Sequence, residues 1–251
     1  MCSEWWRLAL GSLFLLLSGA SCSVKEDRSA CPAALFVVME GLPAAPVALS
    51  IQGEDYDFRL TVPRDTTLLL RVPTSGVRVQ AVAGAVAEAD GSVSIPPGFD
   101  CPPLYLFDAK VDTSHETARV NVQLHKHFCA LTLRFEGPPG WGEPYWAEVR
   151  GWVEGLTAWG RPIPGSFRYR LDGGYTCRLP RQDPSAQLWL DVVMPDQVVR
   201  SFALDRYLEQ ASFDWTAPDL EDLELTLSLS VTEVVLHIGL WETVIPLNVE
   251  I

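Results

Sequence analysis

Apolar and polar residues alternate with a period of two along most of the chain. The stretch 56–62 is the clearest, with aromatic and aliphatic residues at its even positions and polar residues at the odd ones. The same alternation occurs in 47–52, 77–81, 223–231 and 245–251. Side chains of a strand point alternately to opposite faces, so this pattern predicts half-buried β-strands.

Turn sequences separate these predicted strands. Asp90-Gly91 and Asp172-Gly173-Gly174 are two of them, and the chain has 19 Pro and 18 Gly in all. Many short strands at such spacing are typical of antiparallel sandwiches and not of a parallel sheet. Leu204–Gln210 is the one expected helix, because Leu204, Tyr207 and Leu208 have helical spacing.

The alternation changes parity between Leu124 and Leu131. Apolar residues occupy even positions in 120–124 and odd positions in 131–135. A straight strand cannot change parity, because one residue of slip moves every side chain to the other face. We therefore expect a bulge or a break between Leu124 and Leu131.

The tryptophans divide the chain near the same point. Nine Trp occur, of which Trp5 and Trp6 precede residue 22, and the other seven lie from Trp141 onwards. We therefore predict an all-β chain of two tandem antiparallel β-sandwiches, residues 32–117 and 118–251.

The N-terminus has the features of an export signal. Arg7 precedes an apolar run over 8–17, and about ten residues are too few to span a bilayer, which needs roughly 20. Small residues then lead into Cys22, which resembles a bacterial lipobox, so residues 1–21 are predicted to be a signal peptide and Cys22 the lipidated residue. Ordinary secretion, with a cysteine there by chance, is the alternative.

Residues 22–31 are expected to form a lipidated tether. Lys25-Glu26-Asp27 within it resembles the acidic signal that sends some lipoproteins to the outer face of the outer membrane in Bacteroidota-type bacteria. The alternative is that these residues are only a solvated spacer.

Composition limits the partners. The chain has 251 residues and a formal net charge of −13. Nucleic acids and anionic membrane surfaces select cationic faces, so neither is expected as the main partner. At 48% hydrophobic residues and 20% charged ones, the chain can bury a core.

Four cysteines lie beyond the lipidation site, and an exported location permits disulfides. Cys31 and Cys101 each precede a proline near the start and end of the first predicted domain, and a bridge closing a loop of about 70 residues would stabilise by roughly 4 kcal/mol. Cys129 and Cys177 alternate with apolar residues, which favours buried positions. A free buried thiol is the alternative for all four.

Two polar groups are candidates for a catalytic or metal site. His125, His127 and Cys129 form an H-x-H-x-C pattern with three soft ligands, but the parity change is expected to separate them, so no metal is predicted. The acidic run 219–224 has no second carboxylate partner across a cleft and is expected to be a solvated turn. The common catalytic and nucleotide-binding motifs do not occur, so neither an enzymatic activity nor a cofactor is predicted.

Four tryptophans allow a binding hypothesis. Trp141, Trp146, Trp152 and Trp159 could form a flat platform for stacking sugars, or they could fill the second core. Trp152, near Val149 and Val153 in a predicted strand, is expected in the core.

Taken together, several motifs resemble the fimbrillin-A associated anchor proteins. They are Cys22 to Ser29 followed by Cys31-Pro32, Pro103-Leu104-Tyr105, Val122 to Phe128, Gly165 to Arg168, Leu179 to Gln182, and Asp219 to Trp241. The resemblance implies two transthyretin-like β-sandwich domains and a non-enzymatic, lipid-anchored basal subunit at the cell outer membrane. It also implies a fimbrillin-like shaft subunit as partner, in a system thought to grow by strand addition. A surface lipoprotein that binds a glycan or a host protein, without a fimbria, is the alternative.

Overall fold

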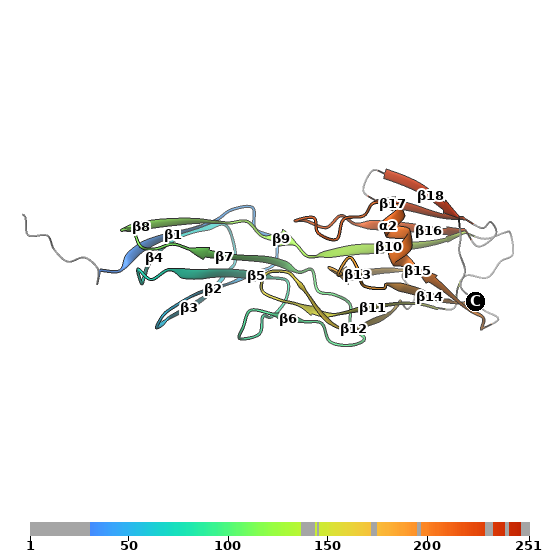
Figure 1. Cartoon of the computed structure of the whole chain (residues 1–251), viewed down its shortest axis with the longest axis horizontal. Coiled ribbons are helices and arrows are strands. Elements are labelled where there is room, and N and C mark those ends of the chain that lie inside the picture. The colour runs from blue at the N-terminus through green and yellow to red at the C-terminus, as the bar shows by residue number, and fades with distance from the viewer. Residues whose placement is uncertain are drawn as a thin grey trace, which may run out of the picture. The chain divides into compact units, whose positions relative to one another are not determined.

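The computed structural model describes residues 31–136, 144, 146–171, 175–194, 197–228, 233–238 and 241–246. Over these residues the chain is almost entirely β-structure, with eighteen strands and one short helix in four sheets (Figure 1). The all-β class predicted from the period-two alternation is confirmed. Residues from Pro32 onwards belong to one compact unit.

The first half of the chain forms two sheets around one core. The five-stranded sheet has the order β3-β2-β5-β7-β9, and the three-stranded sheet has the order β4-β1-β8. The bounds of these strands are β1 Ala33–Met39, β2 Val47–Gly53, β3 Tyr56–Val62, β4 Thr66–Val72, β5 Val77–Ala83, β7 Tyr105–Val111, β8 Thr117–Val122 and β9 His125–Lys126. Their inward positions are aliphatic; Leu35, Leu49 and Ile51 are among the fully buried side chains.

The second half forms two further sheets around a larger core. One has the order β13-β10-β16-β17-β18, and the other has the order β12-β11-β14-β15, with the short strand β6 also paired to β11. The bounds are β6 Val93–Ser94, β10 Phe128–Glu136, β11 Trp146–Leu156, β12 Pro162–Leu171, β13 Thr176–Pro180, β14 Trp189–Val193, β15 Val199–Ala203, β16 Leu223–Ser228, β17 Glu233–Ile238 and β18 Trp241–Pro246. Phe202, Leu156 and Leu179 lie in this core.

The helix α2 covers Leu204–Gln210, as its spacing predicts. Leu204, Tyr207 and Leu208 are its buried residues. Positions i, i+3 and i+4 share one face of a helix, so these three side chains turn together towards the core.

The predicted break in parity is confirmed. β8 ends at Val122, β9 is only two residues long, and β10 begins at Phe128. The two interruptions let 120–124 and 131–135 present their apolar side chains to different cores without any strand changing parity.

The change from the first core to the second comes later than the predicted boundary at 117/118. β8 begins at Thr117 and pairs with β1, and β9 pairs with β7, so the first pair of sheets extends to Lys126. In the other direction, β6 pairs with β11, and Val93, Ile95, Cys101 and Leu104 lie in the second core. A segment of the first half therefore packs into the second core.

The expectation of purely antiparallel pairing was wrong for two strand pairs. β1 pairs in parallel with β8, and β10 pairs in parallel with β16. Two parallel neighbouring strands must be joined by a long connection. The local alternation that identifies a strand therefore does not indicate which strand pairs with it in parallel.

Candidate functional site

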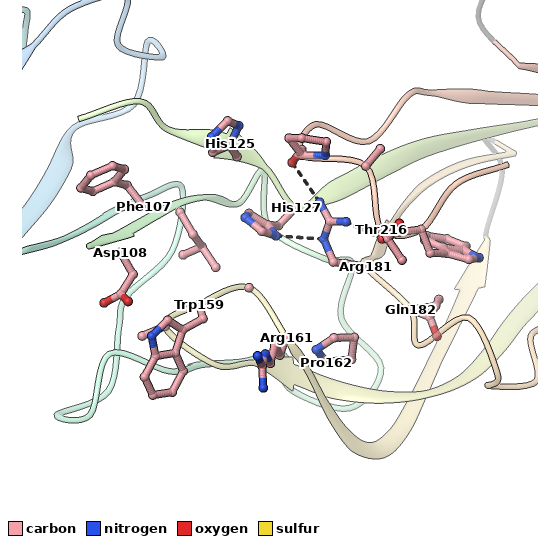
Figure 2. Close-up of a pocket in the computed structure, with 16 residues that line it drawn as sticks. Phe107, Asp108, His125, His127, Trp159, Arg161, Pro162, Arg181, Gln182 and Thr216 are labelled. Atoms are coloured by element: carbon pink, nitrogen blue, oxygen red, sulfur yellow. Dashed lines mark hydrogen bonds between the residues drawn. The ribbon is translucent and has the colours of Figure 1, made fainter. Parts of the chain in front are cut away.

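A cavity of about 440 Å³ lies where segments of both halves meet. Its lining comes from β7, from β9 and His127 just after it, from the turn 158–162, and from the loops at 181–182 and 215–218 (Figure 2). Ligand sites are commonly concave recesses of about 300–1,000 Å³, so this cavity is large enough for a small molecule.

His127 and Arg181 form the buried wall of the cavity. Their side chains are 9% and 6% exposed. The Arg181 Nε–H donates to His127 Nδ1 at 3.0 Å, and the guanidinium also donates to the carbonyl oxygens of Trp215 and Pro218 (Figure 2). Arg181 therefore ties the end of β13 to the start of β10 and to the loop before β16.

Burial and the neighbouring Arg181 cation lower the pKa of His127 to about 4. The imidazole is therefore neutral at pH 7. Because Nδ1 accepts from Arg181, the neutral ring carries its proton on Nε2. Burial likewise lowers the pKa of Arg181, but guanidinium remains charged in proteins. The cavity wall thus contains one buried positive charge.

Asp219 and Asp222 fasten the strand that carries His125 and His127. Asp219 accepts from the Lys126 backbone N–H at 2.7 Å and lies 3.2 Å from His125 Nδ1. Asp222 accepts from Lys126 Nζ at 2.6 Å and from the Ala130 backbone N–H at 2.7 Å. The acidic run is solvent-exposed as expected, but these two carboxylates also have specific structural partners.

Trp159 stands at the rim of the cavity on a tight turn. The Gly160 N–H donates to the Thr157 carbonyl, and the Arg161 N–H donates to Thr157 Oγ1 at 3.1 Å. The indole is 57% exposed. The Arg78 guanidinium lies 4.0 Å from the ring centroid and pairs with Asp108 at 2.6 Å, so a cation covers one face of the ring.

The tryptophans that were candidates for a sugar platform or for the second core lie in different environments. Trp152 is 60% exposed, so its predicted core position was wrong: on β11 it alternates with Val149 and Val153 and takes the opposite face. Trp146 stacks with Arg170, Trp159 belongs to the turn at the cavity, and Trp141 lies outside the described residues.

The H-x-H-x-C pattern is divided between three environments. His125 faces Asp219, His127 faces Arg181, and Cys129 is fully buried in the second core. Among the described residues, no group of three His, Cys, Asp or Glu side chains could hold a metal ion.

The predicted Cys31–Cys101 bridge is not present. Both are free thiols: Cys31 is exposed and Cys101 is fully buried. Cys101 lies in the second core with Cys129 and Cys177, because the segment after β6 crosses to that half. Burial raises the pKa of the Cys101 thiol to about 12 and also raises the pKa values of the other two buried thiols.

The lipidation site Cys22 and the export signal Lys25, Glu26 and Asp27 lie outside the described residues. In the described part of the chain, no helix has the length and apolar character needed to cross a bilayer. Sequence reasoning did not identify the roles of Arg181 or of Arg78. All the partners of these two side chains are distant along the chain: Asp108 and Trp159 for Arg78, and His127, Trp215 and Pro218 for Arg181. The local sequence pattern therefore gives no signal for these contacts.

By sequence, the chain matches no family model and no curated protein. By structure, it is similar to an adhesin candidate from Bacteroides ovatus, with 14% identity, 86% of this chain and 96% of that one covered, and a TM-score of 0.62. It is also similar to the fimbrial anchor protein Mfa2 from Porphyromonas gingivalis, with 12% identity, coverage of 84% and 99%, and a TM-score of 0.59. A fimbrial assembly protein from Parabacteroides distasonis matches at 13% identity, with coverage of 86% and 99% and a TM-score of 0.54.

These matches cover most of this chain and nearly all of each matched chain. The resemblance to fimbrial anchor proteins inferred from the motifs is therefore confirmed at the level of the fold. None of the three proteins is described as an enzyme.

Proposed function

We propose that the chain is an outer-membrane lipoprotein that anchors a fimbria to the cell surface as its basal subunit. The observation that carries the proposal is the fold shared with the fimbrial anchor Mfa2 along 84% of this chain and 99% of that one. Fold alone does not fix function, so the proposal also depends on how the chain would hold the membrane and the shaft.

Cys22 would hold the membrane. A diacylated cysteine supplies at least two acyl chains, which is enough for stable anchoring where a single chain is not. The compact body begins at Pro32, so residues 22–31 would be the tether, with a reach of up to about 35 Å when extended. Lys25, Glu26 and Asp27 would direct the lipoprotein to the outer face.

β3 and β4 would hold the shaft. In the described chain, β3 is the outermost strand of the five-stranded sheet and β4 is the outermost strand of the three-stranded sheet. They are consecutive and belong to the two sheets that enclose the first core, so the proposed attachment site is the pair of their outer edges. An exposed strand edge is a template for pairing with another chain.

Four apolar side chains of these two strands are only partly buried. Tyr56 and Phe58 of β3, and Leu68 and Leu70 of β4, pack against the first core without being enclosed by it. A strand from a shaft subunit could pair with the free backbone edge and place alternate apolar side chains among these residues, which is the usual mode of strand addition.

The proposal is tested by deleting the gene in a strain that makes fimbriae. Loss of the basal anchor should leave the shaft subunit synthesised but released, so that polymerised fimbriae appear in the culture medium. Electron microscopy of the cells and immunoblotting of the medium measure this release. Fimbriae that remain on the cells at the wild-type number would contradict the proposal.

A surface adhesin without a fimbria is the second candidate, favoured by the similarity to the Bacteroides ovatus protein. In that case deletion should reduce binding of cells to a target surface and leave the shaft subunits of the strain unaffected.

A further inference from the structure

The cavity at His127 and Arg181 is not part of the attachment site proposed above, because none of its lining residues lies on β3 or β4. Its lining includes an exposed indole, an exposed guanidinium and a buried cation (Figure 2). We propose that this cavity binds an acidic sugar unit of a polysaccharide, with the pyranose ring stacked on Trp159 and the sugar carboxylate paired with Arg161.

The charges of the cavity favour an anion. The Asp108 carboxylate is neutralised by Arg78 at 2.6 Å, and Asp219 is shared between His125 and a backbone N–H. Within the described residues, neither Arg161 nor Arg181 has a carboxylate within 4.0 Å of its guanidinium. Asp214 and Asp219 favour the charged form of Arg181 from beyond ion-pair range. Arg161 is therefore the exposed cation of the cavity that has no carboxylate in ion-pair range, in a chain whose net charge is −13.

The two arginines would act differently. Arg181 is buried and its donors are taken by His127 and by backbone carbonyls, so it contributes a fixed positive field. Arg161 is exposed, and its planar guanidinium is free to form a bidentate pair with a carboxylate. Arg161 is thus the residue expected to contact the acid group directly.

Trp159 supplies the stacking surface. Arg78 covers one face of the indole at 4.0 Å, and 57% of the side chain remains exposed. The turn is held in place by its hydrogen bonds and by Gly160, which lies against the His127 ring. A fixed aromatic face loses little conformational entropy when it binds, and the apolar C–H face of a pyranose is complementary to it.

The backbone around the cavity favours a saccharide over a peptide strand. A strand needs free main-chain groups, but the N–H groups of Lys126, His127, Gly160, Arg161 and Arg181 all donate within the protein. Recognition must then come from side chains, which suits a ring with a carboxylate.

The test is calorimetric titration of the full-length protein in detergent. The acidic probes are a galacturonic acid trisaccharide and 3′-sialyllactose, and the matched neutral probes are a galactose trisaccharide and lactose. At least one acid should bind at least tenfold more tightly than its neutral counterpart, and this preference should shrink with added salt because an exposed ion pair is screened.

Three variants locate the site. Trp159→Ala should weaken binding at least tenfold, whereas Trp152→Ala, which removes an equally exposed tryptophan on β11, should change it less than twofold. Arg161→Gln should bring the affinity for the acid down to that for the neutral sugar. Arg64→Gln, which changes an exposed arginine between β3 and β4 outside the cavity, should not. Circular dichroism shows whether each variant keeps its fold.

The proposal is overturned if neither acid binds, if acid and neutral sugars bind equally, or if Trp152→Ala is as damaging as Trp159→Ala. A hexapeptide with a free C-terminal carboxylate serves as a further probe. Binding of that peptide without binding of either acidic sugar would also overturn it.

Discussion

Gly160 lies directly against the imidazole ring of His127. A Cβ atom at position 160 would stand 2.0 Å from His127 Cε1, and the glycine has a φ of +73°. Both the contact and the backbone conformation require glycine here. Through this contact, the buried His127–Arg181 pair sets the position of the turn that carries Trp159.

Gly160→Ala should therefore destabilise the protein by roughly 2–4 kcal/mol, from the cost of positive φ and from overpacking the His127 ring. Gly98→Ala is the matched control: its φ is +80° and nothing lies within 4 Å of its Cβ position, so it should cost only about 1 kcal/mol. Urea unfolding followed by tryptophan fluorescence measures both. Equal losses for the two variants would show that the His127 contact is unimportant.

Stability should decrease between pH 6.5 and pH 4. The folded pKa of His127 is lowered to about 4 from the usual 6.5, so in this range the unfolded chain binds a proton that the folded chain does not. The free energy of unfolding therefore decreases by roughly 2–3 kcal/mol as the pH is lowered from 6.5 to 4.

His127→Gln should reduce this slope while leaving an acceptor for Arg181, and His115→Gln, at an exposed position, should not change it. The measurement is the urea midpoint at a series of pH values. An unchanged slope in His127→Gln would show that the pH dependence has another source.

Thiol reactivity should distinguish Cys31 from the three buried cysteines. In a soluble form that begins at residue 23, Cys31 should react rapidly with Ellman's reagent in the native state, and four thiols should react in urea without reductant. Burial and raised pKa values protect Cys101, Cys129 and Cys177. Cys31→Ser should abolish the rapid phase, whereas two missing thiols in urea would indicate a disulfide.

The fragment 118–251 should not fold cooperatively, although the alternation of its own strands suggests independence. It lacks β6 and the buried side chains of Val93, Ile95, Cys101 and Leu104, which belong to its core. Removing several buried side chains at once costs more than the usual stability of a domain. A sharp urea transition in the fluorescence of this fragment would contradict the account.

The features predicted well from sequence are those with a local cause. The strand at 56–62 and the helix at 204–210 follow from the spacing of their own side chains, and the break after Leu124 follows from parity alone. The outward position of Trp152 could also have been predicted from parity. Val149 and Val153 occupy odd positions and share the buried face of the strand, so Trp152, at an even position, points to the other face.

The features that were missed depend on contacts between distant segments. The parallel pairing of β1 with β8 joins strands from opposite ends of the first half, and Cys101 is buried in the second core because the segment after β6 packs there. The cavity is another case, since Arg78, His127 and Arg181 come together only in the folded chain. The sequence shows which residue types are present, but it does not show that these residues lie close together in the fold.

The central proposal, that this chain is a lipoprotein that anchors a fimbria, is tested most directly by one substitution in living cells. With Cys22→Ala, the protein should lose its lipid, and the shaft subunit should move from the cell fraction to the culture medium as intact fimbriae. Cys31→Ala, in the same predicted tether, is the matched control and should leave the fimbriae on the cells. Fimbriae that stay attached in Cys22→Ala cells lacking lipidated protein would contradict the account.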